Sequence, residues 1–130
     1  CRGNFQSAWM AEGAYDPVAD AVFNQTGIDV FFLEYDTERA GDLAPLRLLP
    51  KGNQRVMVGF VTTKSGELES PDTLRRKFDE ASKYADLEQL GIAPQCGFAS
   101  TEEGNKLTED EQKQKLELVT ATAERIWGSV

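Results

Sequence analysis

Three side chains of this sequence could together bind a metal ion: Cys1, Glu34 and Cys96. Glu34 lies near the end of the apolar run 28–35, and Cys96 directly follows the run 90–95. If these runs are parallel strands, and if Cys1 also ends a strand, the three side chains meet at one edge of the sheet. Two thiolates and a carboxylate suit Zn²⁺, and three protein ligands with an open fourth position are typical of catalytic zinc. A zinc site is therefore one interpretation of these residues.

Each of these residues also has an ordinary structural interpretation. Cysteine is among the most often buried residue types, so Cys96 could fill the core. A disulfide is a second alternative, and the wide separation of Cys1 and Cys96 matches no local zinc motif. Glu34 could cap the following turn or form an ion pair with Arg39. Spacing alone leaves these alternatives open.

Other polar residues follow the same runs. Thr62, Thr63 and Lys64 come after the run 55–61, and Gln95 directly precedes Cys96. The carboxyl ends of parallel strands are where binding and catalytic groups gather in α/β folds. A lysine in a loop is typically exposed, and we expect Lys64 to be solvated.

Three short apolar runs, 28–35, 55–61 and 90–95, supply the predicted strands. The first two are almost continuous in β-branched and aromatic residues, and the third is weaker. Continuous apolar runs, rather than alternating ones, are typical of strands buried on both faces of a parallel sheet.

Three helices have recognisable starting residues: Asp16 before Pro17, Ser70 before Pro71, and Thr108 with Glu111 three residues later. Such side chains accept hydrogen bonds from the first turn of a helix, and proline fits its first position. We expect helices over 17–26, 71–85 and 109–127, the last burying the stripe Leu116, Val119, Ala123 and Ile126. The segment 38–50 is limited by two prolines to a short helix.

Strands that alternate with helices predict an α/β fold with a parallel sheet. We assign residues 1–130 to a single unit, because no linker or repeat divides the chain. Three or four βα units make about half of a (β/α)8 TIM barrel, so we expect upstream residues to supply the other half. The first residue, Cys1, is not a methionine, which fits the expectation of an incomplete barrel.

The composition narrows the function. The net charge of −8 arises from 14 basic and 22 acidic residues with no basic cluster, which argues against nucleic-acid and anionic membrane partners. No apolar run approaches the roughly 20 residues of a membrane span, and no signal peptide is recognisable, so we expect a cytoplasmic protein. The chain contains no histidine, which excludes Ser-His-Asp and Cys-His catalysis within it.

Four stretches of the sequence resemble a known family: "CRGN", "FFLEYDTERAGD", "VGFVTTKSGELES" and "APQCGFASTEEGNKLTEDE". They are similar to the C-terminal half of the catalytic barrel of cobalamin-independent (vitamin-B12 independent) methionine synthases, especially the shorter single-barrel members. The same superfamily includes uroporphyrinogen decarboxylases and the zinc-dependent epoxyalkane:coenzyme M transferases. The resemblance covers essentially the whole chain in consistent order.

The resemblance implies a zinc site. In that family a His-x-Cys pair and a distant cysteine bind zinc. By the resemblance, Cys1 corresponds to the cysteine of the pair and Cys96 to the distant cysteine. The histidine would precede Cys1 by two residues. Glu34 corresponds to a glutamate that is a further ligand, whereas Arg39 comes later than the arginine of the family.

The implied function is zinc-dependent thiol alkyl transfer, with homocysteine as the thiol and 5-methyltetrahydrofolate, or another methyl donor, as the source of the methyl group. One alternative keeps the zinc and the thiol chemistry but uses coenzyme M or another small thiol, with an epoxide or a methyl-corrinoid donor. A second alternative is a metal-free, decarboxylase-like barrel. A third is an inactive half-barrel that requires its missing N-terminal half.

Overall fold

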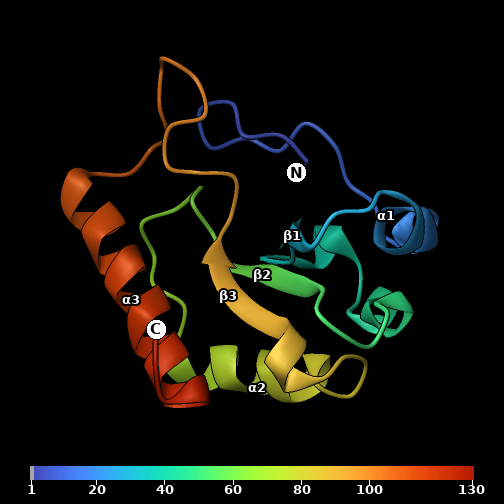
Figure 1. The fold of residues 1–130 in the computed structure, drawn as a ribbon. Coiled ribbons are helices and arrows are strands. Elements are labelled where there is room, and N and C mark those ends of the chain that lie inside the picture. The colour runs from blue at the N-terminus through green and yellow to red at the C-terminus, as the bar shows by residue number, and fades with distance from the viewer. Residues whose placement is uncertain (1) are drawn as a thin grey trace.

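A computed structural model describes residues 2–130 and contains one three-stranded sheet. The strands are β1 (Val30–Glu34), β2 (Arg55–Val61) and β3 (Leu90–Pro94). They lie side by side in chain order, and both neighbouring pairs are parallel (Figure 1). The three predicted strands and the parallel α/β class are therefore confirmed.

Helices and 3-10 turns connect the strands. They are α1 (Ala19–Gln25), η1 (Glu38–Ala40), η2 (Ala44–Leu48), α2 (Pro71–Ala81), η3 (Leu87–Gln89) and α3 (Glu109–Trp127). Ser70 accepts a hydrogen bond from the Thr73 N–H, and Thr108 and Glu111 form a reciprocal capping box. The predicted starts of α2 and α3 are thus confirmed, because these side chains satisfy N–H groups that lack partners within the helix.

The predicted start of the first helix is wrong. α1 begins at Ala19, with Val18 as its N-cap and no side-chain cap. The N–H groups of Val18 and Ala19 both donate to the carbonyl of Tyr15, so a turn precedes the helix. The carboxylate of Asp16 lies 3.8 Å from the guanidinium of Arg47 and does not cap α1.

The helix-covered face of the sheet carries the core. Val56, Val58 and Phe60 alternate along β2 and are buried beneath the helices. The Phe60 ring meets the Phe78 ring of α2 edge-on at 5.0 Å, and Phe78 meets Trp127 of α3 in the same way at 5.1 Å. In Figure 1, α2 lies beneath the sheet and α3 runs beside β3. This packing holds the strand ends in fixed positions.

The opposite face of the sheet is largely uncovered within the described part of the chain. Phe32 and Met57 are partners in the register of β1 and β2, and Phe32 is 71% exposed. Met57 is also paired with Gly91, where an added Cβ would lie 2.5 Å from the Met57 sulfur. The glycine therefore gives the methionine room to lie across β3 on this face.

The N-terminal segment and the loop after β3 lie side by side at the carboxyl ends of the strands (Figure 1). The side-chain amide of Asn4 donates to the carbonyl of Gly97 at 3.0 Å and to Ser100 Oγ at 2.8 Å. The Lys106 N–H donates to Ser7 Oγ at 2.8 Å. These bonds bring the N-terminal segment over the edge where the polar side chains gather. Among residues 2–130, no helix is both long and apolar enough to cross a membrane.

Candidate functional site

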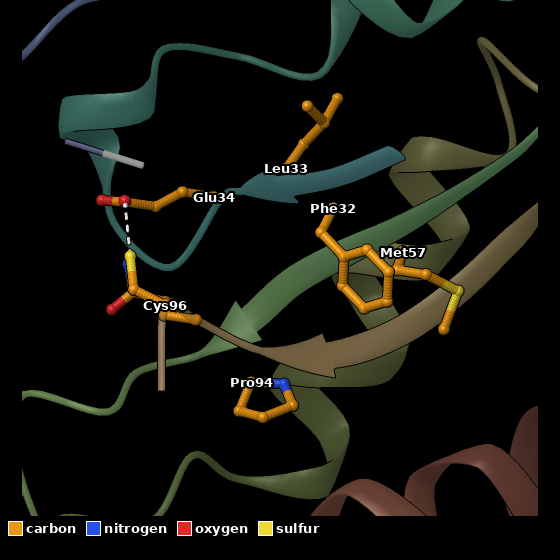
Figure 2. Close-up of a pocket in the computed structure, with 7 residues that line it drawn as sticks. Phe32, Leu33, Glu34, Met57, Pro94 and Cys96 are labelled. Atoms are coloured by element: carbon orange, nitrogen blue, oxygen red, sulfur yellow. Dashed lines mark hydrogen bonds between the residues drawn. The ribbon is translucent and has the colours of Figure 1, made fainter. Parts of the chain in front are cut away.

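Two of the three predicted zinc ligands meet at the carboxyl edge of the sheet. Glu34 is the last residue of β1, and Cys96 comes two residues after the end of β3. The Cys96 Sγ lies 3.6 Å from the Glu34 Oε2, the contact drawn as a dashed line in Figure 2. The parallel topology therefore brings together residues that are far apart in the chain.

Cys96 is exposed at this edge, so the interpretation of Cys96 as a core residue is wrong. It is disulfide-bonded in the structure, so metal binding concerns the reduced form of its sulfur. The third predicted ligand, Cys1, lies outside the described residues. Among residues 2–130, no group of three or more His, Cys, Asp and Glu side chains is placed to hold a metal ion.

Gly97 follows Cys96 with a φ of +112°, a backbone conformation that favours glycine. An added Cβ at this position would meet no atom within 4 Å. The glycine is therefore required by the turn of the backbone after Cys96, rather than by crowding around the sulfur.

Glu34 is only 4% exposed, and its two carboxylate oxygens differ. Oε2 accepts a hydrogen bond from the Arg2 N–H at 2.9 Å, whereas Oε1 is buried without a hydrogen-bond partner among the described residues. Arg39 pairs with Glu12 at 3.4 Å, so the alternative in which Glu34 pairs with Arg39 is wrong.

A buried carboxylate oxygen without a partner reduces stability, because it has lost its hydrogen bonds to water and has formed none within the protein. A cation at Oε1 of Glu34 would satisfy this oxygen. Sulfur and carboxylate oxygen are both zinc ligands, so the Glu34–Cys96 pair fits the metal that the resemblance implies.

The backbone around Glu34 is held from two sides. The Glu34 N–H donates to the Tyr15 hydroxyl at 2.9 Å. Beyond the strand, the Lys77 ammonium of α2 donates to the carbonyls of Tyr35 and Asp36 at 3.3 and 3.1 Å. Burial lowers the pKa of Lys77, while the Asp36 and Glu69 carboxylates raise it. These contacts fix the direction in which the Glu34 side chain leaves the strand.

A hollow of about 320 Å³ opens beside the Glu34–Cys96 pair on the uncovered face of the sheet. Glu34, Gln95 and Cys96 form its polar part. In Figure 2, Phe32 and Met57 lie to the right of Cys96, and Pro94 lies beneath it. A mainly apolar hollow with a few convergent polar groups is the usual form of a small-molecule site.

Lys64 is buried, not solvated as the sequence predicted. It is 6% exposed, with its Nζ 3.4 Å from the Gln95 Oε1 and 5.2 Å from the centre of the Trp9 ring. Burial lowers the pKa of Lys64, and the carboxylates of Glu34 and Asp36 act against that shift. The prediction failed because the N-terminal segment, which carries Trp9, covers the loop.

A buried ion pair links this edge to α3, and sequence reasoning missed it. The Thr62 N–H at the end of β2 donates to the Glu69 Oε1 at 2.8 Å, and the Glu69 Oε2 lies 2.9 Å from the Lys115 Nζ. Lys115 is fully buried, whereas Leu116, predicted to face the core, is 43% exposed. Lys115 shares the helical spacing of Val119 and Ile126, which is the signal that could have revealed it.

No family model matches the chain. Two proteins of Bacillus subtilis (strain 168), the uncharacterized proteins YxjG and YxjH, are 52% and 46% identical to it over 127 residues. Each match covers 98% of this chain but only 34% of the relative. The chain therefore spans about a third of the length of these relatives.

Two solved structures share the fold. One is a Listeria monocytogenes protein provisionally named a vitamin-B12 independent methionine synthase, with a TM-score of 0.73 and 36% identity over 99% of this chain and 34% of that one. The other is a B12-independent methionine synthase of Shewanella sp. W3-18-1, solved in complex with selenomethionine, with a TM-score of 0.70 and 22% identity. The Shewanella match covers 86% of this chain and 30% of the Shewanella chain. At 22% identity this match shows the fold alone.

The resemblance seen in the sequence is therefore confirmed. Over nearly its whole length, the chain is similar to a portion of a B12-independent methionine synthase-like protein, and it covers about a third of that protein's length. Its fold is a small α/β unit with a parallel sheet, like the corresponding part of those proteins.

Proposed function

We propose that this chain is the C-terminal half of a (β/α)8 barrel in a zinc-dependent thiol alkyltransferase. The reaction that we favour is methyl transfer to homocysteine, giving methionine, in the cytoplasm. The observation that carries the proposal is the Glu34–Cys96 pair at the carboxyl edge of the sheet, with the buried Glu34 Oε1 lacking a hydrogen-bond partner. The resemblance to a protein named as a methionine synthase supports the same reaction.

Zinc would be held by Cys96, Glu34 and Cys1, with an upstream histidine as the fourth protein residue of the family pattern. When bound, zinc lowers the pKa of a thiol at its open position, so that a thiolate is available near neutral pH. The chain supports this chemistry by fixing its ligands. The Arg2 N–H holds the Glu34 Oε2, which leaves Oε1 for the metal.

The uncovered face of the sheet supports the half-barrel part of the proposal. Phe32 is 71% exposed and lies beside the hollow next to the ligand pair. In a closed barrel this face lies inside and is covered by side chains of the other strands. The missing N-terminal half would therefore complete the hollow and supply contacts to the methyl donor, for which a reduced folate is our first choice.

The direct test is methionine formation by the full-length protein that contains this chain, reduced and loaded with zinc. Homocysteine is supplied with 5-methyltetrahydrofolate, and coenzyme M is supplied in parallel as the acceptor of the alternative reaction. We expect methionine from the wild type and a loss of at least a hundredfold in Glu34→Gln and Cys96→Ser, since each variant removes a proposed ligand. Glu117→Gln, at an exposed glutamate of α3, is the matched control.

Methionine formation that is unchanged in both ligand variants would contradict the assignment of the site. Alkylation of coenzyme M in place of homocysteine would favour the alternative acceptor and retain the zinc-thiol chemistry.

A further inference from the structure

Several buried hydrogen-bond donors beside the Glu34–Cys96 pair lack an acceptor. The Gln95 Oε1 is contacted by the Lys64 Nζ at 3.4 Å and by the Thr62 Oγ1 at 3.2 Å. An ammonium can only donate, so the Lys64 contact identifies this end of the amide as the oxygen. The Gln95 Nε2 is then left buried with no acceptor among the described residues.

The Lys64 ammonium also has more hydrogen-bond donors than acceptors. Its ammonium has three N–H donors, and the one acceptor recorded for it among residues 2–130 is the Gln95 Oε1. No carboxylate in that part of the chain lies within 4.0 Å of its Nζ, although Glu34 and Asp36 are near enough to influence its pKa. The Trp9 Nε1, from the ring that lies over Lys64, is likewise buried without an acceptor.

The buried donors of Lys64 and Gln95 could bind an oxyanion, beside the carboxylates of Glu34 and Asp36 that also act on Lys64. Buried donors that lack acceptors are costly, and a charged acceptor satisfies more than one of them at once. Gln95 also lines the hollow that contains Glu34 and Cys96. A ligand in that hollow would therefore reach the metal-binding pair and Gln95, and the Lys64 ammonium lies next to the Gln95 amide.

We propose that Lys64 and Gln95 form an oxyanion subsite that takes the carboxylate of the acceptor amino acid. This inference rests on the proposed function, because it places the sulfur of the same ligand at the Glu34–Cys96 pair. The geometry suits a small amino acid whose sulfur and carboxylate are a few bonds apart, since Gln95 and Cys96 are adjacent in the chain. Lys64 supplies the charge, and Gln95 supplies a neutral donor beside it.

The test uses calorimetric titration of the full-length, reduced, metal-free protein with two ligands that differ by one carboxylate. They are L-methionine and 3-(methylthio)propylamine, neither of which has a thiol to bind metal. We expect the wild type to bind L-methionine at least tenfold more tightly than the amine, as a charge-assisted hydrogen bond predicts. Lys64→Met should abolish this preference and leave the affinity for the amine within about twofold.

Lys64→Arg keeps the charge and should retain most of the preference, whereas Lys106→Met, at an exposed lysine, should change nothing. If Lys64→Met does not fold, as judged by circular dichroism, Gln95→Leu takes its place, with a partial loss of the preference as the expected result.

A third ligand, 2-(methylthio)ethanesulfonate, distinguishes a site for a carboxylate from a site for a sulfonate. Tighter binding of the sulfonate than of L-methionine would overturn the carboxylate assignment.

Equal affinity of the wild type for L-methionine and the amine would overturn the subsite. So would an equal loss of affinity for both ligands in Lys64→Met, and so would a wild type that binds neither ligand. The zinc content of the same preparations, measured after metal loading, reports separately on the proposed function. A protein that holds zinc but shows no carboxylate preference contradicts the subsite alone. A protein that shows the preference but holds no zinc contradicts the metal site alone.

Discussion

The two faces of the β-sheet differ in what covers them. On one face, Val56 and Val58 are fully buried, and Phe60 packs edge-on against Phe78 of α2. On the other face, Phe32 is 71% exposed, and a hollow of about 320 Å³ lies beside it. The chain completes the first layer with its own helices and leaves the second open at the carboxyl edge, where the candidate ligands lie.

The difference shows that stability and chemistry are concentrated in separate regions. The helix-covered face consists mainly of apolar side chains, which need no hydrogen-bond partner. The carboxyl edge holds buried polar groups that lack one, including the Glu34 Oε1 and the Gln95 Nε2. Such groups reduce stability unless they are satisfied, so their presence together at one edge points to a ligand.

Phe60→Ala should have the largest effect on stability. It removes a fully buried ring and its edge-on contact with Phe78, and the cavity should lower the free energy of unfolding by about 3–5 kcal/mol. Urea unfolding followed by circular dichroism measures the change. A loss below about 1 kcal/mol would mean that the helix-covered face is not the main source of stability.

Lys115→Met should cause the second-largest loss of stability. Lys115 is fully buried and pairs with Glu69 at 2.9 Å, so the variant leaves a largely buried carboxylate without its partner. We expect a loss of about 3 kcal/mol in the same unfolding experiment. The double variant Lys115→Met, Glu69→Leu should recover part of that loss, and a double variant less stable than Lys115→Met would refute this explanation.

Phe32→Ser tests the uncovered face. In the 130-residue chain the ring is mostly exposed, so the free energy of unfolding should change by no more than about 0.5 kcal/mol. In the full-length protein the proposed barrel covers this face, and the same substitution should cost about 2 kcal/mol or more. Equal small effects in both proteins would argue against a closed barrel.

Asp36→Asn should have the smallest effect, and its sign depends on pH. Burial raises the pKa of Asp36 above its usual value near 3.8, so the folded protein retains this proton more strongly than the unfolded chain. Below pH 3.8 both states are protonated, and stability from this group is lost as the pH rises through the folded-state value. Asparagine does not ionise, so the stability of the variant relative to wild type should increase between pH 4 and pH 8. A flat difference across that range would contradict the assigned cause.

Much of the fold could be predicted from the sequence, because the strands are continuous apolar runs and two helices begin with strong caps. The meeting of Glu34 and Cys96 was also predictable, since the carboxyl ends of parallel strands share one edge. The burial of Lys64 was not, because it depends on how the N-terminal segment with Trp9 folds over a loop more than 50 residues away. The start of α1 failed for a similar reason, since Asp16 lies beside Arg47. Long-range contacts of this kind leave no local signal.

The most direct test of the account is the zinc content of the full-length protein under reducing conditions. We expect about one zinc per chain in the wild type and in the control Glu117→Gln, and much less than one in Glu34→Gln and in Cys96→Ser. The reduced, folded wild type without zinc would contradict the account, and so would ligand variants that hold as much zinc as the wild type.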